Sequence, residues 1–247
     1  MLSFARLFIS TRPPMRYWCF TLLFFTLLAN AQGGGVYLGA TRVVFSSSAK
    51  TAALRVGNTS ATDVWLVRSW VSGGDESAGA EPLKVPFIIT PPLYRLDPQS
   101  SLHLKINALP NTLPQDRESL FYVNVMAIPP SQSVEEGGGS VAGVMKFTFN
   151  NRIKLFYRPA GLADKAGSAY EQVRVEPSAE GFSFHNPTPY HITLTQLTID
   201  GVAHEKAGLM LAPFGHGSIP YQGPMKSLSF KSINDFGGFS SVVSKLF

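Results

Sequence analysis

The chain has 247 residues, of which 45% are hydrophobic and 15% are charged, with 18 Pro and a single Cys. This composition is too apolar for a disordered protein and too poor in cysteine for a disulfide-stabilised scaffold. The net charge of +5 would suit a nucleic-acid partner, but residues 1–31 contribute three arginines and no acid. The remaining 216 residues carry 18 Lys and Arg against 16 Asp and Glu, a net charge of +2 that provides no phosphate-binding field.

Residues 1–31 have the three parts of a secretory signal peptide. Arg6, Arg12 and Arg16 precede the uncharged apolar run at residues 18–28, which is followed by an Ala-Asn-Ala cleavage site at 29–31. The apolar run of 11 residues is far shorter than the ~20 that a membrane-spanning helix needs. Because the basic region is long, Met1 and Met15 both stay open as the start. The single cysteine lies in this segment, so the exported chain is expected to have no thiol chemistry.

From Val36 onward, short apolar segments alternate with turn residues. Segments of five to eight residues rich in Val, Ile, Phe, Trp and Tyr are typical of strands. We find no segment with a helical period of sufficient length. Clear examples in the first half lie at residues 52–56, 64–71 and 102–106. This spacing predicts an all-β fold built from immunoglobulin-like β-sandwiches.

Pro159-Ala160-Gly161 and the polar run at 164–168 divide the strands into two series. The second series is predicted at residues 170–175, 182–185, 190–199, 209–211, 227–230 and 239–243. We therefore expect three parts: the signal peptide at 1–31, an N-terminal Ig-like domain at 32–159 and a C-terminal Ig-like domain at 160–247.

Residues 145–158 alternate between apolar and polar side chains over 14 positions, whereas a typical strand has about 5–6 residues. Two interpretations stay open. The first is a long core strand bent at Asn150-Asn151, which is the more common arrangement in β proteins. In the second, the first half of the strand extends beyond its own core and offers Met145, Phe147 and Phe149 to another protein.

The sequence LPQDRESLFYVNVMAIPP at residues 113–130 closely resembles the characteristic motif of the periplasmic pilus-assembly chaperones of the chaperone–usher pathway. Further motifs match this family in order and spacing. They are ATRVVF at 40–45, TPP at 90–92, RLDP at 95–98, IKLFYRP at 153–159, NPTPY at 186–190 and INDFGG at 233–238.

The resemblance implies two Ig-like sandwiches in an L (boomerang) arrangement, with the client bound in the cleft. Arg42 and Lys154 match the two cleft cations that bind the C-terminal carboxylate of a pilin subunit. A carboxylate only accepts hydrogen bonds, so it needs charged donors when it leaves water. Without the resemblance, both cations would be interpreted as solvated strand residues.

The resemblance also places Met145, Phe147 and Phe149 on the strand that the family lends to its client, with Val141 as a further anchor. A pilin subunit resembles a sandwich that lacks its last strand, and the chaperone strand fills the open groove by donor-strand complementation. The register upstream of Met145 stays open.

Three charged residues, Glu118, Arg158 and Asp235, correspond to an interdomain charge network of the family. The Thr90-Pro91 bond matches a position that tends to be cis. An interdomain charge network of this kind mainly fixes the orientation of the domains, because desolvation offsets much of its Coulomb energy.

No nucleophile elbow, phosphate-binding loop or metal-ligand cluster is present, so we expect no catalytic residue, no cofactor and no metal. The resemblance implies a periplasmic chaperone that binds and stabilises pilin or fimbrial subunits and delivers them to an outer-membrane usher. Self-association of the free protein stays open, whereas nucleic acid and membrane insertion after signal cleavage are not expected. The alternative function is an exported Ig-like structural or adhesive fibre component. Such a subunit needs an N-terminal donor extension, for which residues 32–35 are too short.

Overall fold

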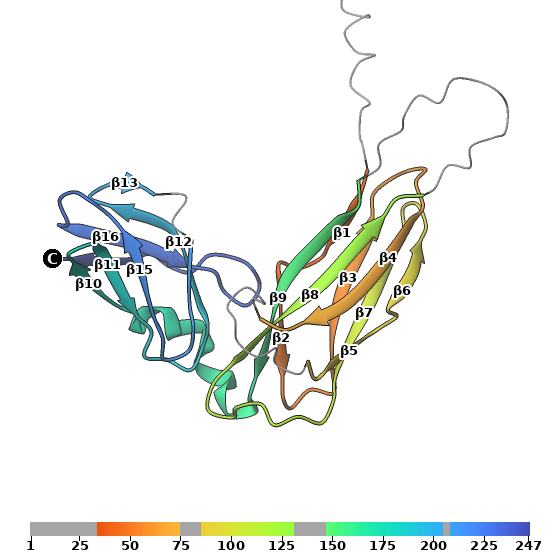
Figure 1. Cartoon of the computed structure of the whole chain (residues 1–247), viewed down its shortest axis with the longest axis horizontal. Helices are drawn as coiled ribbons and strands as arrows, with labels where there is room; N and C mark the ends of the chain where they lie inside the picture. The colour runs from red at the N-terminus through yellow and green to blue at the C-terminus, as the bar shows by residue number, and fades with distance from the viewer. Residues whose placement is uncertain (1–33, 75–84, 131–146, 205–207) are drawn as a thin grey trace, which may run out of the picture. The chain divides into compact units, whose positions relative to one another are not determined.

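The computed structural model describes residues 34–74, 85–130, 147–204 and 208–247. The expected signal peptide and two expected donor-strand residues, Val141 and Met145, lie outside these residues. Strands dominate the described chain, and they form two sandwiches, one before and one after the helix η3 in the sequence (Figure 1). The predicted all-β, two-domain Ig-like fold is therefore confirmed. Among the described residues, no helix has the length and apolar character needed to cross a bilayer.

The first sandwich consists of two sheets. One has the order β1-β3-β7-β5 and the other the order β2-β9-β8-β4-β6. All neighbouring strands are antiparallel except β2 and β9, which pair in parallel. The strands are β1 (Val36–Leu38), β2 (Arg42–Ser46), β3 (Thr51–Asn58), β4 (Trp65–Ser72), β5 (Phe87–Thr90), β6 (Leu93–Leu96), β7 (Ser101–Ala108), β8 (Ser119–Ile128) and β9 (Phe149–Arg158).

The core of the first sandwich is formed by the inward-facing residues of both sheets, as the two-residue period of strands requires. In this core, Phe87 makes edge-to-face contacts with Phe45 at 5.4 Å and Phe121 at 5.0 Å between ring centroids. These contacts join β2 and β8 of one sheet to β5 of the other. The Thr90–Pro91 peptide bond that follows β5 is cis, as expected.

The second sandwich has a three-stranded sheet in the order β10-β11-β15. Its other sheet has the order β13-β12-β16-β17, with β14 also paired to β12. The largest fully buried side chains of its core are Phe182, Phe184, Phe230, Leu194 and Leu197. The strands are β10 (Arg174–Ser178), β11 (Gly181–His185), β12 (Ile192–Ile199), β13 (Val202–Ala203), β14 (Leu209–Leu211), β15 (His216–Pro220), β16 (Ser227–Ser232) and β17 (Val243–Leu246).

The segment between the sandwiches differs from the prediction. Residues Ala160–Gln172 form the 3₁₀ helix η3, where we expected a polar hinge and the start of a strand at 170. Ala169 and Val173 are buried in the second core, and Leu162 and Tyr170 pack against it. This helical spacing of apolar residues was missed because small and charged residues separate them.

One further strand prediction in the second half is corrected, and two strands of that half were not predicted. The last strand is β17, which starts at Val243 rather than at 239, and Phe239 forms only an isolated bridge with Ile233. The strands β13 and β15 were not predicted. Because β13 has two residues and β15 contains Gly217 and Pro220, neither has the β-branched and aromatic run that indicates a strand.

The two cores predict that substitution of a buried leucine lowers the free energy of unfolding far more than substitution of an exposed one. Leu104 is 0% exposed in the first core, whereas Leu246 on β17 is 86% exposed. Leu104→Ala should lower the free energy of unfolding by about 2–5 kcal/mol, because it leaves a cavity. Leu246→Ala should change it by less than about 0.5 kcal/mol. Urea unfolding followed by circular dichroism tests this, and equal losses in the two variants would contradict the assigned core.

Candidate functional site

Two cations lie side by side at the start of the parallel strand pair. β2 and β9 pair so that Arg42 is opposite Lys154. Arg42 is buried and Lys154 is half-buried. Burial lowers the pKa of Arg42, although the charges of Asp235 and Glu118 oppose this shift. Burial also lowers the pKa of Lys154, and the neighbouring charge of Arg42 lowers it further. Folding therefore holds two like charges together with reduced solvation.

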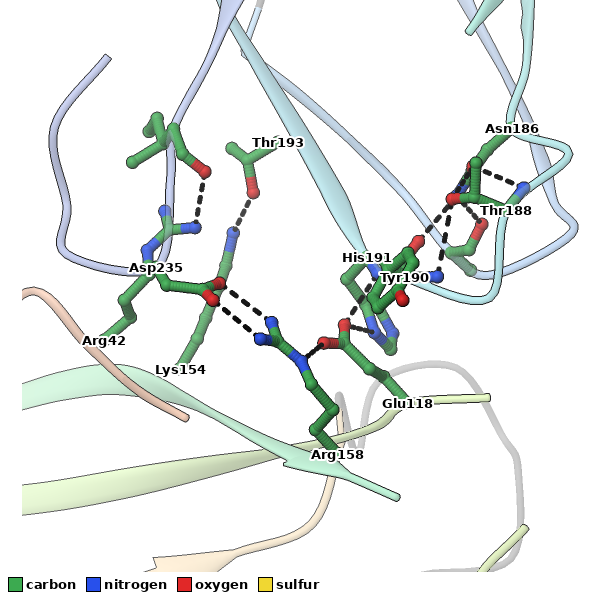
Figure 2. A network of polar contacts seen from close by, with 12 residues as sticks. Arg42, Glu118, Lys154, Arg158, Asn186, Thr188, Tyr190, His191, Thr193 and Asp235 are labelled. Carbon is green, nitrogen blue, oxygen red and sulfur yellow. Dashed lines mark hydrogen bonds and ion pairs between the residues drawn. The ribbon is translucent and has the colours of Figure 1, made fainter. Parts of the chain in front are cut away.

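The hydrogen bonds of these two cations go to uncharged oxygen atoms and not to a carboxylate. Arg42 donates from a terminal guanidinium nitrogen to the carbonyl oxygen of Ile233 at 3.0 Å, and Lys154 Nζ donates to Thr193 Oγ1 at 3.4 Å (Figure 2). The Nε of Arg42 is buried without a hydrogen-bond partner in the described chain. Within those residues, neither cation has an acid at ion-pair distance. An anionic ligand would supply the missing acceptors.

A second charged cluster, formed by Arg158, Glu118 and Asp235, lies next to this pair, and in it the cation is ion-paired with both acids. The Nε of Arg158 donates to Glu118 at 2.7 Å, and its terminal nitrogens donate to both carboxylate oxygens of Asp235 at 2.6 and 2.8 Å (Figure 2). The second oxygen of Glu118 accepts the backbone N–H of His191 at 2.8 Å. Burial opposes the charge of Arg158, but the bonds and charges of the two acids hold its pKa above the usual value.

These residues come from both sandwiches. Glu118 immediately precedes β8, Arg158 ends β9, and Asp235 follows β16. A backbone hydrogen bond of 2.9 Å from Glu118 to the carbonyl of Pro189 accompanies the ion pairs. The side chains of Glu118 and Arg158 are 2% and 10% exposed, whereas that of Asp235 is 39% exposed. The structure thus brings together the three residues that the sequence grouped.

The expected donor segment has an exposed apolar side and an unpaired edge. Phe147 and Phe149 are 60% and 61% exposed, with ring centroids 6.3 Å apart. Farther along β9, Ile153 packs against the first core and Leu155 is fully buried. β8 pairs with β9 from Phe149 onward, but β2 pairs with it only from Lys154 onward. From Phe149 to Ile153, the second edge of β9 therefore has no partner strand in the described chain.

Sequence reasoning missed several residues around the cations. Thr193 lies on β12 in an ordinary alternating pattern, so nothing in the sequence distinguishes it. Ile233 contributes only its carbonyl oxygen, which any residue would supply. His191 follows the NPTPY motif and is held by Glu118 through its main chain, and its ring lies 5.3 Å from that of Phe156. Only the position of His191 beside a recognised motif could have indicated it.

Comparisons with known proteins match both halves. Residues 35–163 match the sequence family described as pili and flagellar-assembly chaperone, PapD N-terminal domain, and residues 168–243 match the PapD C-terminal domain. The chain is 39% identical to the probable fimbrial chaperone LpfB of Escherichia coli O157:H7, over 89% of this chain and 91% of the relative. It is 34% identical to the chaperone protein FimC of Escherichia coli K12, over 87% and 85% of the two chains.

Solved structures agree with these sequence matches. The periplasmic chaperone SfaE matches with a TM-score of 0.70 and 32% identity, covering 86% of this chain and 100% of that chain. The structure of the Salmonella enterica SafA pilin in complex with the SafB chaperone gives a TM-score of 0.75 and 28% identity, covering 86% and 96%.

The charge cluster of Arg158, Glu118 and Asp235 predicts a large loss of stability when its most buried acid is removed. Glu118→Ala leaves part of Arg158 and the N–H of His191 without an acceptor, so the free energy of unfolding should fall by roughly 3 kcal/mol. Asp116→Ala is the control, since Asp116 forms an exposed pair with Arg117 and its removal should have no measurable effect. Urea unfolding of both variants measures the difference. Unchanged unfolding of Glu118→Ala would contradict a stabilising role.

Proposed function

Because the chain belongs to the PapD family of pilus-assembly chaperones, we propose that it is a periplasmic protein that binds pilin subunits and delivers them to an outer-membrane usher. The proposed mechanism is donor-strand complementation. The observation that carries it is the unpaired edge of β9, which carries Phe149 at its start and ends at Arg42 and Lys154. No observation favours the alternative of a fibre component, since the relatives are named as chaperones.

The direction of the client strand follows from the position of β2. β2 occupies the edge of β9 from Lys154 onward, so an incoming strand finds room only on the preceding stretch. If the client carboxylate binds Arg42 and Lys154, the client strand ends there and runs parallel to β9. The client's last strand would then continue the line of β2 on the same edge.

Apolar burial and charge pairing contribute differently to this complex. Burying Phe147 and Phe149 in a client groove contributes about 1.5–3 kcal/mol each. Each charge-assisted hydrogen bond to the client carboxylate contributes a similar amount, about 1.5–3 kcal/mol. The carboxylate also fixes the register, because a slip by one residue would turn Thr148 into the groove in place of the phenylalanines.

The expected parts of the chain take defined roles in this proposal. The signal peptide at 1–31 directs export, and the domains at 32–159 and 160–247 form the two sides of the client site. The ion pairs of Arg158 with Glu118 and Asp235 support an interdomain role, since they connect residues of both sandwiches. Val141 and Met145 would extend the donor strand beyond Phe147.

Removal of either cation should weaken client capture. In periplasmic co-purification, we expect Arg42→Ala and Lys154→Ala each to capture about 10-fold less fimbrial subunit than the wild type does, or less still. Each variant loses a charge-assisted hydrogen bond to the client carboxylate. Lys105→Ala is the matched control, since Lys105 is an exposed strand lysine on β7. Wild-type capture by both cleft variants would contradict the carboxylate anchor.

A charge on the donor segment should abolish capture without unfolding the chaperone. Phe147→Asp places a carboxylate where the proposal requires an apolar contact, but Phe147 is 60% exposed and outside the core. The control is Val202→Asp on β13, where the side chain is 62% exposed. Co-purification and thermal unfolding are measured together. Normal capture by Phe147→Asp would remove the donor-strand assignment.

A further inference from the structure

Phe236 is a large apolar side chain that is 95% exposed, directly after Asp235. Single exposed apolar residues are common on proteins, so exposure alone indicates no function. Two further features distinguish this residue: the order of its loop and its position beside Arg42.

The loop that carries Phe236 is held by hydrogen bonds of the residues before and after it in the chain. Asn234 Oδ1 accepts the backbone N–H groups of Phe236 at 3.0 Å and Gly238 at 2.9 Å. The N–H of Asn234 donates to the carbonyl of Gly238 at 2.8 Å, and that of Gly237 donates to the carbonyl of Asn234 at 3.0 Å. The preceding Asp235 is fixed by its two bonds to Arg158. The backbone at Phe236 is thus ordered before any ligand binds.

Gly237 brings this loop against the strand of the cleft arginine. Its φ of +85° lies in the left-handed region, which favours glycine, and a Cβ at this position would collide with the hydroxyl of Thr41. Thr41 immediately precedes Arg42. The backbone that carries the exposed ring of Phe236 therefore lies against the residue that precedes Arg42.

Phe236 and Arg42 line the same two cavities. One of about 380 Å³ is lined by Phe156 and Ile192, and one of about 460 Å³ runs beside β2. Both cavities are lined by Arg42, Asp235 and Phe236. A ligand whose anionic end binds Arg42 thus has an apolar ring beside the residue that carries the anion.

We propose that Phe236 is a specificity-determining residue that packs against an apolar side chain of the client's last residue, the residue that carries the C-terminal carboxylate. This inference rests on the proposed function, because a carboxylate at Arg42 places the side chain of the same client residue near the ring. An acidic side chain would be disfavoured there by the carboxylates of Asp235 and Glu118, which line the same cavity. Since the loop is already ordered, the contact costs little conformational entropy.

Four synthetic peptides test the proposal by fluorescence anisotropy with the mature chain. They share one sequence of alternating apolar and polar residues, with Leu or Ser as the last residue and a free carboxylate or an amide at the end. The wild type should bind the Leu peptide about 10-fold more tightly than the Ser peptide. Phe236→Ser should reduce this preference to about 3-fold or less and keep the preference for the carboxylate. Leu246→Ser is the control for an exposed apolar residue outside both cavities and should bind as the wild type does.

The outcomes separate this proposal from the proposed function. An unchanged Leu preference in Phe236→Ser overturns the role of Phe236, even when the carboxylate preference is intact. Equal binding of carboxylate and amide peptides by the wild type contradicts the carboxylate anchor instead, as does a carboxylate preference that persists in Arg42→Ala. A wild type that binds none of the four peptides contradicts both. Thermal unfolding of Phe236→Ser should match the wild type, because the ring makes no core contact.

Discussion

The parallel pairing of β2 with β9 is the constraint on which the site depends. Within the described part of the first sandwich, every other pair of neighbouring strands is antiparallel. The parallel register sets Arg42 directly opposite Lys154 and leaves the preceding edge of β9 open. One backbone arrangement therefore produces the charged end and the pairing edge together. The distance between these two features is fixed by the sheet and not by flexible side chains.

The balance of charge around this pair explains why it remains available for a ligand. Arg42, Lys154 and Arg158 face two acids, Glu118 and Asp235, and both acids are ion-paired with Arg158. Asp235 and Glu118 act on Arg42 only through their charge and not by ion-pair contact. These five residues together thus carry an excess of one positive charge in a partly desolvated position. There the attraction to an added carboxylate is less screened than in water.

The sequence pattern predicted more of the fold than of the site. Short runs rich in Val, Ile, Phe, Trp and Tyr predicted many of the strands, because these side chains suit a pleated, half-buried surface. The two-residue period of a strand with one buried face predicted the long strand at 145–158. The same period could not decide between a core strand and an exposed one at Phe147 and Phe149, since both show identical alternation. Exposure depends on where the neighbouring sheet ends, which is a tertiary property. The identities of Arg42 and Lys154 came from family resemblance, because an isolated strand cation carries no sign of burial.

The polar face of β9 explains how an exposed apolar segment stays ordered. Asn150 donates to Asn124 of β8 at 3.2 Å, and the guanidinium of Arg152 lies 3.8 Å from the ring centroid of Tyr122. Both contacts lie on the free stretch of the strand, and they add to its backbone bonds with β8. Since β8 itself is anchored in the core by Phe121, Val123 and Val125, the stretch is held from one edge while the other remains open. A strand held in this way loses little entropy when it pairs with a client, so the energy of burying its phenylalanines is available for binding.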